Sequence, residues 1–387
     1  MVKMILVALF IATGLSMNSQ NLDGLTFGTD STLDVMTWNI ERFPKNGQAT
    51  LTYVVDIIEA LDVDVIALQE IDSKSRFEEL VDNLDGWEGF YSNAEFAPLA
   101  YVYKPDVIAV REIYQIYTGM TRVFPRPPYV MDLEYRGERI ILINNHFKCC
   151  GDGVLESEDD WDEETRRLDA SNMLDEYVSE NFPDNNVMIL GDLNDIITDD
   201  FDDNVFRAFT DAPENYAFAD MDIANGNFSG WSFPNWPSHI DHILVTNELF
   251  EALGNSTSDI QTIKVDEFLD GGFDEYDDNV SDHRPVALKI DIGSEVVSTG
   301  DLSASEVRLF GYPNPFRQTT TITFKSALSS TELEIYNSVG QKVGNYTLGD
   351  GQSAVVWNAE ELSAGVYYVV LLIDRELAVI TKLLKVD

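Results

Sequence analysis

The sequence of 387 residues predicts a mixed α/β domain over residues 30–292, followed by a small all-β domain over residues 306–387. Three observations predict this division. Up to about residue 292, short apolar runs alternate with segments whose apolar residues recur at helical spacing. A short polar stretch rich in Ser and Gly follows at 293–305 and is typical of a linker. Beyond it, strand-like runs alternate with turn residues.

The elements of the first domain follow from hydrophobic periodicity. Short apolar runs predict buried strands over 63–68, 140–143, 187–190 and 240–245. Alternation or β-branched residues favour further strands over 107–117 and 286–290. Apolar residues at helical spacing, with charged residues opposite them, predict helices over 51–61 and 165–177. In the second domain, the same criteria predict strands over 319–324, 333–336, 354–357 and 366–373.

Residues 1–20 have the pattern of a secretory signal peptide. Lys3 gives a positive start, residues 5–15 are apolar, and residues 16–20 are small and polar. The apolar run is shorter than the roughly 20 residues that a membrane-spanning helix needs. No other run approaches that length, so we expect an exported chain without a stable membrane span.

The chain is strongly acidic, with 25 Lys and Arg against 68 Asp and Glu and a net charge of −43. From residue 300 onward there are 7 basic and 10 acidic residues, so about −40 lies in the first part, which also holds all four histidines. Such a charge excludes a basic clamp that binds nucleic acid through many phosphate contacts. If the substrate is a phosphate polyanion, a divalent cation must neutralise the reacting group.

The two cysteines, Cys149 and Cys150, are adjacent, which excludes a disulfide-rich scaffold and a thiolate zinc finger. Two alternatives remain open: two half-buried thiols in a loop, or a vicinal disulfide that braces this loop after export. Acidic clusters at 156–164, 199–203 and 270–278 predict solvated loops. None of them has the ligand spacing of an EF-hand.

Polar residues stand where the predicted strands of the first domain end or begin. A single residue of this kind is usually turn chemistry, but six strand ends supply the set Asn39, Glu70, His146, Asp192, Asn194, Asp241, Asp282 and His283. Carboxylate and amide oxygens suit a hard cation such as Mg²⁺, and a His beside an Asp can move a proton to or from water. Together these groups predict metal-assisted hydrolysis of a phosphate ester.

Six motifs contain these residues: Thr37-Trp38-Asn39-Ile40, Leu68-Gln69-Glu70, Asn145-His146-Phe147-Lys148, Gly191-Asp192-Leu193-Asn194, Ile240-Asp241-His242-Ile243 and Ser281-Asp282-His283-Arg284-Pro285-Val286. In this order they resemble the motifs of the endonuclease/exonuclease/phosphatase, or deoxyribonuclease I-like, family. The resemblance covers about residues 30–292. It implies a four-layer α-β-β-α sandwich of two mixed sheets and a divalent-metal-dependent phosphoester hydrolase.

The resemblance also implies roles for individual residues. Glu70 is the expected principal Mg²⁺ ligand, with Asn39 and Asp282 beside it, and Mn²⁺ and Ca²⁺ are alternative metals. His283 is expected to act as a base or as a partner of the reacting phosphate, and Asp241 is expected to orient it.

Four further residues complete the expected site. By resemblance, Asp192 activates water or protonates the leaving oxygen, Asn194 holds a phosphate oxygen, and His146 hydrogen-bonds the scissile phosphate. Arg126, in the segment 124–128, resembles the position from which family members offer an arginine to the phosphate, although a solvated loop arginine is the other interpretation. His239 and His242 are interpreted as structural or substrate-contacting residues rather than metal ligands.

The substrate remains open at this stage. The first hypothesis is a secreted nuclease that cuts extracellular DNA or RNA. A second is a phosphatase or phosphodiesterase for lipid head groups, inositol phosphates or small nucleotides, which the charge of about −40 favours because it repels DNA. The third is a surface binding protein that keeps the scaffold without catalysis.

The last 80 or so residues resemble a type IX secretion sorting domain. The resemblance rests on residues 311–316, the strand at 319–324, residues 365–368 and the closing segment 381–385. It implies a partner in the export machinery and a secreted or cell-surface location. A small β-sandwich binding module is the alternative interpretation.

Overall fold

The computed structural model describes residues 22–292 apart from 95, and residues 308–386 apart from 313, 315, 326–330, 339, 349–353 and 374–375. The predicted signal peptide at 1–20 and the predicted linker at 293–305 lie outside the described residues.

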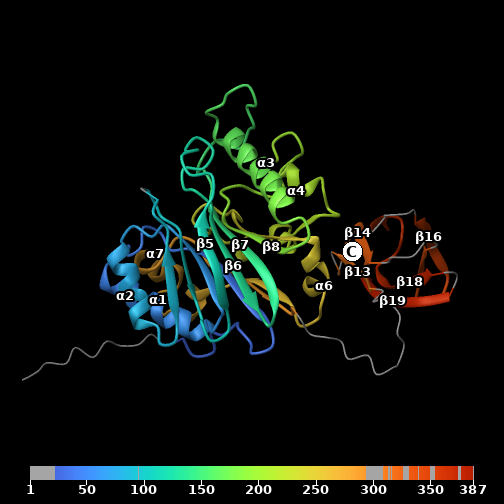
Figure 1. Ribbon diagram of the computed structural model, residues 1–387, viewed down its shortest axis with the longest axis horizontal. Helices are drawn as coiled ribbons and strands as arrows, with labels where there is room; N and C mark the ends of the chain where they lie inside the picture. The colour runs from blue at the N-terminus through green and yellow to red at the C-terminus, as the bar shows by residue number, and fades with distance from the viewer. Residues whose placement is uncertain are drawn as a thin grey trace, which may run out of the picture.

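Residues 33–290 contain two mixed six-stranded sheets that pack face to face (Figure 1). The first sheet has the order β11-β12-β1-β2-β4-β3 and the second β5-β6-β7-β8-β10-β9. Within each, one pair is parallel, β1 with β2 and β7 with β8, and the other pairs are antiparallel. The strands are β1 (Leu33–Asn39), β2 (Val65–Gln69), β3 (Glu88–Tyr91), β4 (Ala100–Tyr103), β5 (Ala109–Gln115), β6 (Tyr129–Tyr135), β7 (Glu138–His146), β8 (Asn186–Asp192), β9 (Tyr216–Phe218), β10 (Asp241–Thr246), β11 (Asp259–Thr262) and β12 (Val286–Ile290).

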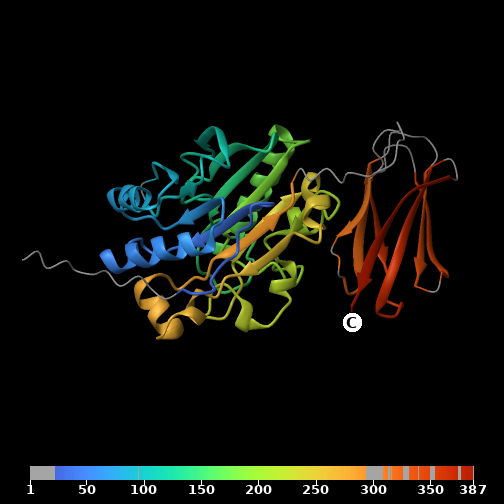
Figure 2. The same ribbon diagram turned by 90° about the horizontal axis from the view of Figure 1, so that it is seen from below.

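Helices cover the outer faces of both sheets, as Figure 2 shows for α1 along the first sheet. Apolar residues of α1 (Gln48–Leu61), α2 (Lys74–Asn83) and α7 (Gly272–Asn279) form one buried cluster with the first sheet. Those of α3 (Glu163–Asn181) and α4 (Arg207–Thr210) form another with the second sheet. A third cluster lies between the sheets. These are the four layers that the resemblance implied. The remaining short helices are α5 (Met221–Ala224), α6 (Phe250–Leu253), η1 (Phe228–Gly230), η2 (Asn247–Leu249) and η3 (Val265–Phe268).

Two of the acidic clusters are not loops throughout, which corrects the sequence interpretation. Residues 272–279 form α7, because Phe273 and Tyr276 lie three residues apart and pack together against the first sheet. Glu163 and Glu164 open α3, and Asp162 caps its N-terminus by accepting a hydrogen bond from the Thr165 N–H at 2.8 Å. The high Asp and Glu content concealed a helix and a helix start.

Residues 308–385 form two small sheets around a core of their own. The strands are β13 (Arg308–Tyr312), β14 (Thr319–Lys325), β15 (Thr331–Asn337), β16 (Lys342–Leu348), β17 (Ala354–Asn358), β18 (Gly365–Ile373) and β19 (Glu376–Lys385). They are arranged as β13-β14-β17 and β16-β15-β18-β19. The buried Trp357 ring contacts Phe316 and Tyr367, with centroids 5.3 and 5.2 Å away. In the described part of the chain, no helix is long and apolar enough to cross a membrane.

A buried carboxyl group at the start of β2 predicts a pH-dependent stability. Burial raises the pKa of Asp64 from its usual 3.8 to about 7, although Oδ2 accepts a hydrogen bond from the Asp34 N–H and Lys104 lies 3.9 Å from Oδ1. Because the folded-state pKa is the higher one, the protonated carboxyl stabilises the fold, and this contribution is lost as the pH rises from about 4 to 7. The Asp64→Asn variant cannot ionise there.

We therefore expect the melting temperature of Asp64→Asn, relative to the unmodified protein, to rise by at least about 2 °C between pH 5 and pH 8. Thermal unfolding followed by circular dichroism at four pH values measures this difference. A difference that does not change with pH would contradict the prediction.

Candidate active site

The strand register gathers the predicted site residues at one rim of the two sheets. The neighbours Asn39 and Gln69 end β1 and β2, so Glu70 follows at the same rim. His146 pairs with Asp192 across β7 and β8, and Asp241 pairs with Asp192 across β10 and β8. The register therefore brings together residues that lie far apart in the sequence.

A glycine allows β7 and β8 to approach each other at this rim. Gly191 has a φ of +144°, and a Cβ atom placed there would lie 2.0 Å from the Asn145 carbonyl oxygen. Any side chain would push the two strands apart. The close approach holds His146 beside Asp192.

Glu70 and its neighbours form the carboxylate side of the site. Glu70 has a φ of +62°, which is unusual for a non-glycine residue, and the Arg42 N–H donates to its Oε2 at 3.1 Å. The Asn39 Nδ2 donates to Glu70 Oε1 at 3.2 Å and to Asp192 Oδ2 at 2.9 Å, while Asn39 Oδ1 accepts from the Glu41 N–H. A carboxamide between two carboxylates turns its NH₂ group toward them, so Asn39 here orients both acids.

His146, at the end of β7, is buried and neutral. The Nε2 atom of His146 lies 3.4 Å from Asp192 Oδ2, and its Nδ1 atom has no hydrogen-bond partner among the described residues. Burial, together with the positive charges of Arg126 and His283, holds the pKa of His146 well below its usual range.

Arg126 is 6 % exposed, so the interpretation as a solvated loop arginine is wrong. Its NH1 group donates to the Phe147 carbonyl at 3.2 Å, and its Nε has no partner among the residues described. Burial lowers its pKa, while the charges of Asp192 and Glu70 raise it. Arg126 is therefore close enough to Asp192 and Glu70 for their charges to act on it.

His283 and Asp241 form a hydrogen-bonded dyad. The Nδ1 atom of His283 lies 2.8 Å from Asp241 Oδ2, and Nε2 lies 3.9 Å from both Asp192 Oδ2 and Asp282 Oδ1. Burial lowers the pKa of His283, but the charges of Asp241 and Asp192 outweigh it and raise the pKa to about 10. Burial raises the pKa of Asp192 to about 7 and that of Asp282 to about 6. The imidazole therefore carries a proton among three acids.

Asn194 lies on the loop after β8, with a φ of +56°, and its N–H donates to Asp192 Oδ1 at 3.1 Å. Arg167 of α3 fixes this loop from behind. It donates to Asp195 Oδ2 at 2.7 Å and to the carbonyls of Lys148 and Cys150 at 2.8 Å each. The loops after β7 and β8 are thus held by one buried arginine.

The loop after β7 contains the two cysteines. Both thiols are free, Cys149 is half-buried and Cys150 is exposed, and the two Sγ atoms lie 3.0 Å apart. The structure therefore has two free thiols in a loop, as in the first alternative, but only Cys149 is half-buried.

Tyr276 is a buried residue of the site that the sequence interpretation missed. Its hydroxyl accepts from the Trp38 Nε1–H at 3.0 Å and donates to the His283 carbonyl at 2.7 Å. It lay inside an acidic run and gave no signal besides its aromatic ring.

The Tyr276→Phe variant tests this link. It leaves the buried Trp38 N–H and the His283 carbonyl without a partner, which costs about 1–3 kcal/mol of unfolding free energy. We expect urea denaturation to show this loss. The turnover number should fall as well, because the His283 backbone loses an anchor. Tyr53→Phe, which removes a hydroxyl that donates to Glu275 Oε1, is the matched control and should retain turnover. Unchanged stability in Tyr276→Phe would contradict the role.

Gln69 and Asn144 form a second link that the sequence did not predict. The Gln69 Nε2 donates to Asn144 Oδ1 at 2.8 Å, and the Asn144 Nδ2 donates to the carbonyls of Leu68 and Ala100 at 3.0 Å each. These bonds join the two sheets just below the site. Because buried polar groups need partners, they also fix how the sheets stack.

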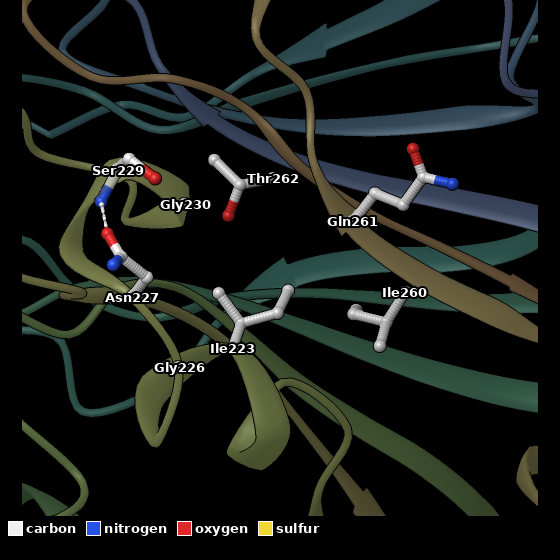
Figure 3. Close-up of a pocket in the computed structure, with 8 residues that line it drawn as sticks. All are labelled: Ile223, Gly226, Asn227, Ser229, Gly230, Ile260, Gln261 and Thr262. Carbon is white, nitrogen blue, oxygen red and sulfur yellow. Dashed lines mark hydrogen bonds between the residues drawn. The ribbon is translucent and has the colours of Figure 1, made fainter.

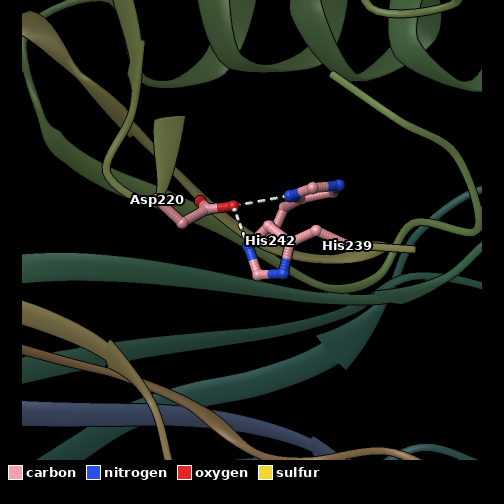
Figure 4. A group of neighbouring side chains, drawn as sticks. All are labelled: Asp220, His239 and His242. Atoms are coloured by element: carbon pink, nitrogen blue, oxygen red, sulfur yellow. Dashed lines mark hydrogen bonds and ion pairs between the residues drawn. The ribbon is translucent and has the colours of Figure 1, made fainter. Parts of the chain in front are cut away.

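His239 and His242 converge on Asp220 in a group that resembles a metal site (Figure 4). The hydrogen bonds argue against a metal there. His242 Nδ1 lies 2.6 Å from Asp220 Oδ2 and its Nε2 lies 2.9 Å from the Asp195 carbonyl, which can accept only, so both nitrogens are donors. His239 Nδ1 accepts from the Ser232 N–H at 3.3 Å. Both rings are buried, which favours the structural alternative for these two histidines.

A hollow of about 350 Å³ lies between the loop after α5 and strand β11 (Figure 3). Its lining consists of neutral side chains and glycines, including Asn227, Gln261 and Thr262. One hydrogen bond links its lining to the site: the Ser229 carbonyl accepts from Arg284, the residue after His283. It contains no group for acid–base chemistry.

Carboxylate oxygens and a His–Asp dyad lie at one rim of the two-sheet sandwich, an arrangement that suits a hydrolase using a divalent metal. The model of the Endonuclease/Exonuclease/phosphatase family matches residues 36–283. The chain belongs to this family, whose members are phosphoester hydrolases that use divalent metals.

Residues 311–386 match the secretion system C-terminal sorting domain, so the protein is secreted or attached to the cell surface, and the export machinery is a partner.

Solved structures share the fold at low sequence identity. D. rerio TDP2 complexed with a single-strand DNA product is 14 % identical, with a TM-score of 0.51, over 67 % of this chain and 99 % of that chain. The human Nocturnin catalytic domain with a bound sulfate anion is 15 % identical, with a TM-score of 0.50, over 67 % and 94 %. No curated protein matches the chain.

Proposed function

We propose that this protein is a secreted, Mg²⁺-dependent phosphodiesterase that acts as a nuclease on extracellular DNA or RNA. One observation carries the proposal: the carboxylates of Glu70 and Asp282, the Asp241–His283 dyad and the buried Arg126 meet at one rim. The family membership supports the hydrolytic class. The single-strand DNA in the TDP2 structure supports nucleic acid as the substrate by analogy.

The oxygen donors at the rim fit a hard cation. The side chains of Glu70 and Asp282 are 22 % and 26 % exposed, so a hydrated ion can reach both. Mg²⁺ keeps several waters and takes only one or two carboxylates in sites of this kind. When bound, it would neutralise negative charge on the phosphate oxygens. Glu70 and Asp282 would hold it, with Asn39 orienting Glu70. The same oxygens could hold Mn²⁺ or Ca²⁺.

The residues of the chain then divide the remaining work. His283, held at Nδ1 by Asp241, presents Nε2 to the phosphate and donates a hydrogen bond to one of its oxygens. Arg126 and Asn194 hold the other oxygens. His146 donates its single N–H, on Nε2, to the scissile phosphate. Asp192 takes the proton of the attacking water, and gives it to the leaving oxygen once the phosphorus–oxygen bond has broken.

The experiment incubates the full-length chain with plasmid DNA, RNA and bis(p-nitrophenyl) phosphate, in Mg²⁺ or in EDTA. We expect cleavage of a nucleic acid and of the small diester in Mg²⁺, and loss of both in EDTA. Cleavage of the small diester with both nucleic acids intact would favour the second candidate, a hydrolase of small phosphoesters. The net charge of −43 is the observation that supports that candidate. No turnover in Mg²⁺, nor in Mn²⁺ or Ca²⁺ in its place, would contradict both.

A further inference from the structure

An exposed tryptophan is held rigidly beside the site. Trp236 is 79 % exposed and lies at the tip of a tight loop over residues 233–238. Phe233 and Ser238 exchange two backbone hydrogen bonds, of 3.0 and 3.2 Å, across the base of the loop. The Ser238 hydroxyl donates to the Trp236 carbonyl at 2.9 Å, and the Asn235 side chain donates to Asp277 of α7 at 2.9 Å. The loop is anchored on both sides, so the exposure of the indole is not a consequence of a loose loop.

The base of this loop contacts the proposed catalytic dyad. The Phe233 ring lies 4.8 Å from the His283 ring, centroid to centroid. The Ser232 hydroxyl accepts from the Asp241 N–H at 3.2 Å. Since Trp236 follows Phe233 by three residues, its Cα lies within about 11 Å of Phe233. A ligand group on the indole is thus within reach of the phosphate that His283 contacts.

A second exposed aromatic residue contacts the site through Arg126. Phe96, on the loop between β3 and β4, is 65 % exposed. The guanidinium of Arg126 lies 5.0 Å from the centroid of its ring. One face of this ring therefore packs on a residue that is proposed to bind phosphate.

Because the chain is strongly acidic, it offers few positive side chains that could contact the phosphates of a polynucleotide. Two of the nearby cations are already paired: Lys45 with Glu41 and Asp277, and Lys148 with Glu163. Non-specific duplex binding depends on such contacts. Stacking of a base on an aromatic ring needs no positive charge and is available to unpaired bases.

We propose that Trp236 is a stacking platform for an unpaired base next to the scissile phosphate, with Phe96 as a second platform, and that the substrate is single-stranded nucleic acid. This inference rests on the proposed nuclease function. In this inference, the two aromatic residues select single-stranded substrates by stacking, and basic side chains do not.

The test compares the full-length protein with Trp236→Ala, Trp236→Phe and the matched control Trp161→Ala, whose indole is 68 % exposed and packs on Arg166. Each is assayed in Mg²⁺ on a single-stranded 12-mer, on the same sequence as a blunt duplex, and on bis(p-nitrophenyl) phosphate. Stacking is worth about 1–3 kcal/mol per base, or roughly 5- to 150-fold. We expect Trp236→Ala to lose at least fivefold in kcat/KM on the single strand and to keep its rate on the small diester. Trp236→Phe should recover part of the loss, and Trp161→Ala should behave as the unmodified protein.

Binding gives an independent readout. In EDTA, fluorescence anisotropy of the labelled 12-mer should show weaker binding to Trp236→Ala than to the unmodified protein or to Trp161→Ala. Binding of the unmodified protein should change little between 50 and 200 mM salt, since few phosphates are neutralised.

Three results would overturn the inference: equal kcat/KM of Trp236→Ala and the unmodified protein on the single strand, faster cleavage of the duplex than of the single strand, or co-sedimentation with phosphatidylcholine vesicles that depends on Trp236 in place of oligonucleotide binding. Failure of the proposed nuclease function would give a different result. The unmodified protein and the Trp236 variants would all leave both nucleic acids intact in Mg²⁺.

Discussion

The Glu70→Gln variant should lose at least about 10³-fold in the turnover of any phosphodiester that the protein cleaves. A metal ligand that loses its charge forfeits several kcal/mol of transition-state stabilisation, and 1.36 kcal/mol corresponds to a factor of ten. The fold should survive the change. Glutamine has nearly the same shape, and its Oε1 can still accept the hydrogen bond that the Arg42 N–H donates to the glutamate at 3.1 Å.

Steady-state kinetics on bis(p-nitrophenyl) phosphate in excess Mg²⁺ measure this loss, and thermal unfolding checks the fold. The control Glu79→Gln removes a carboxylate that pairs with Arg76 on the surface of α2 and should retain full turnover. Isothermal titration with Mg²⁺ provides a readout without turnover: binding should weaken in Glu70→Gln and stay unchanged in Glu79→Gln. Full activity of Glu70→Gln would remove Glu70 from the metal site.

The Asp241→Asn variant should have the second large effect, a loss of about 10²–10⁴-fold in turnover. The asparagine oxygen can still accept the hydrogen bond from His283 Nδ1, which is 2.8 Å long in the present structure, so the geometry should persist. The negative charge is lost. Burial lowers the pKa of His283, and the charges of Asp241 and Asp192 raise it to about 10.

Without the Asp241 charge, the pKa of His283 falls, and the ring loses its proton at a lower pH. We therefore expect the loss of turnover to be larger at pH 8.5 than at pH 6. A pH–rate profile of both proteins measures the shift. Asp175→Asn, which removes a carboxylate that accepts from the Tyr216 hydroxyl, serves as the control and should leave the profile unchanged. An equal loss at both pH values would assign Asp241 a structural role alone.

The strand ends could be predicted from the sequence because their signal is local. The predicted run 187–190 is buried on both faces in β8, and the run predicted at 240–245 is buried in β10 from residue 241 onward. The polar residues at the ends of these runs lie at the rim. Among the strands that the sequence did not predict, β4 and β6 are almost fully buried, whereas β3 and β9 are weakly patterned. β3 is half-exposed, and β9 has three residues, so neither carries a periodicity. The acidic run that forms α7 was wrongly interpreted as a loop because its many charged residues concealed the helical spacing of its two aromatic residues.

The sequence by itself determined the chemistry at the rim: which oxygen and imidazole groups are present, in which order, and at which strand ends. Only the tertiary structure decided how they are supported. Trp38 and Tyr276 are 238 residues apart in the chain, and the bonds of Asp220 to His239 and His242 depend on how neighbouring loops fold back. The burial of Arg126 beneath Phe96 and the exposure of Trp236 on an anchored loop are likewise properties of packing. The physical reason is that hydrophobic periodicity acts within one element, whereas burial and hydrogen bonding depend on what the rest of the chain brings alongside.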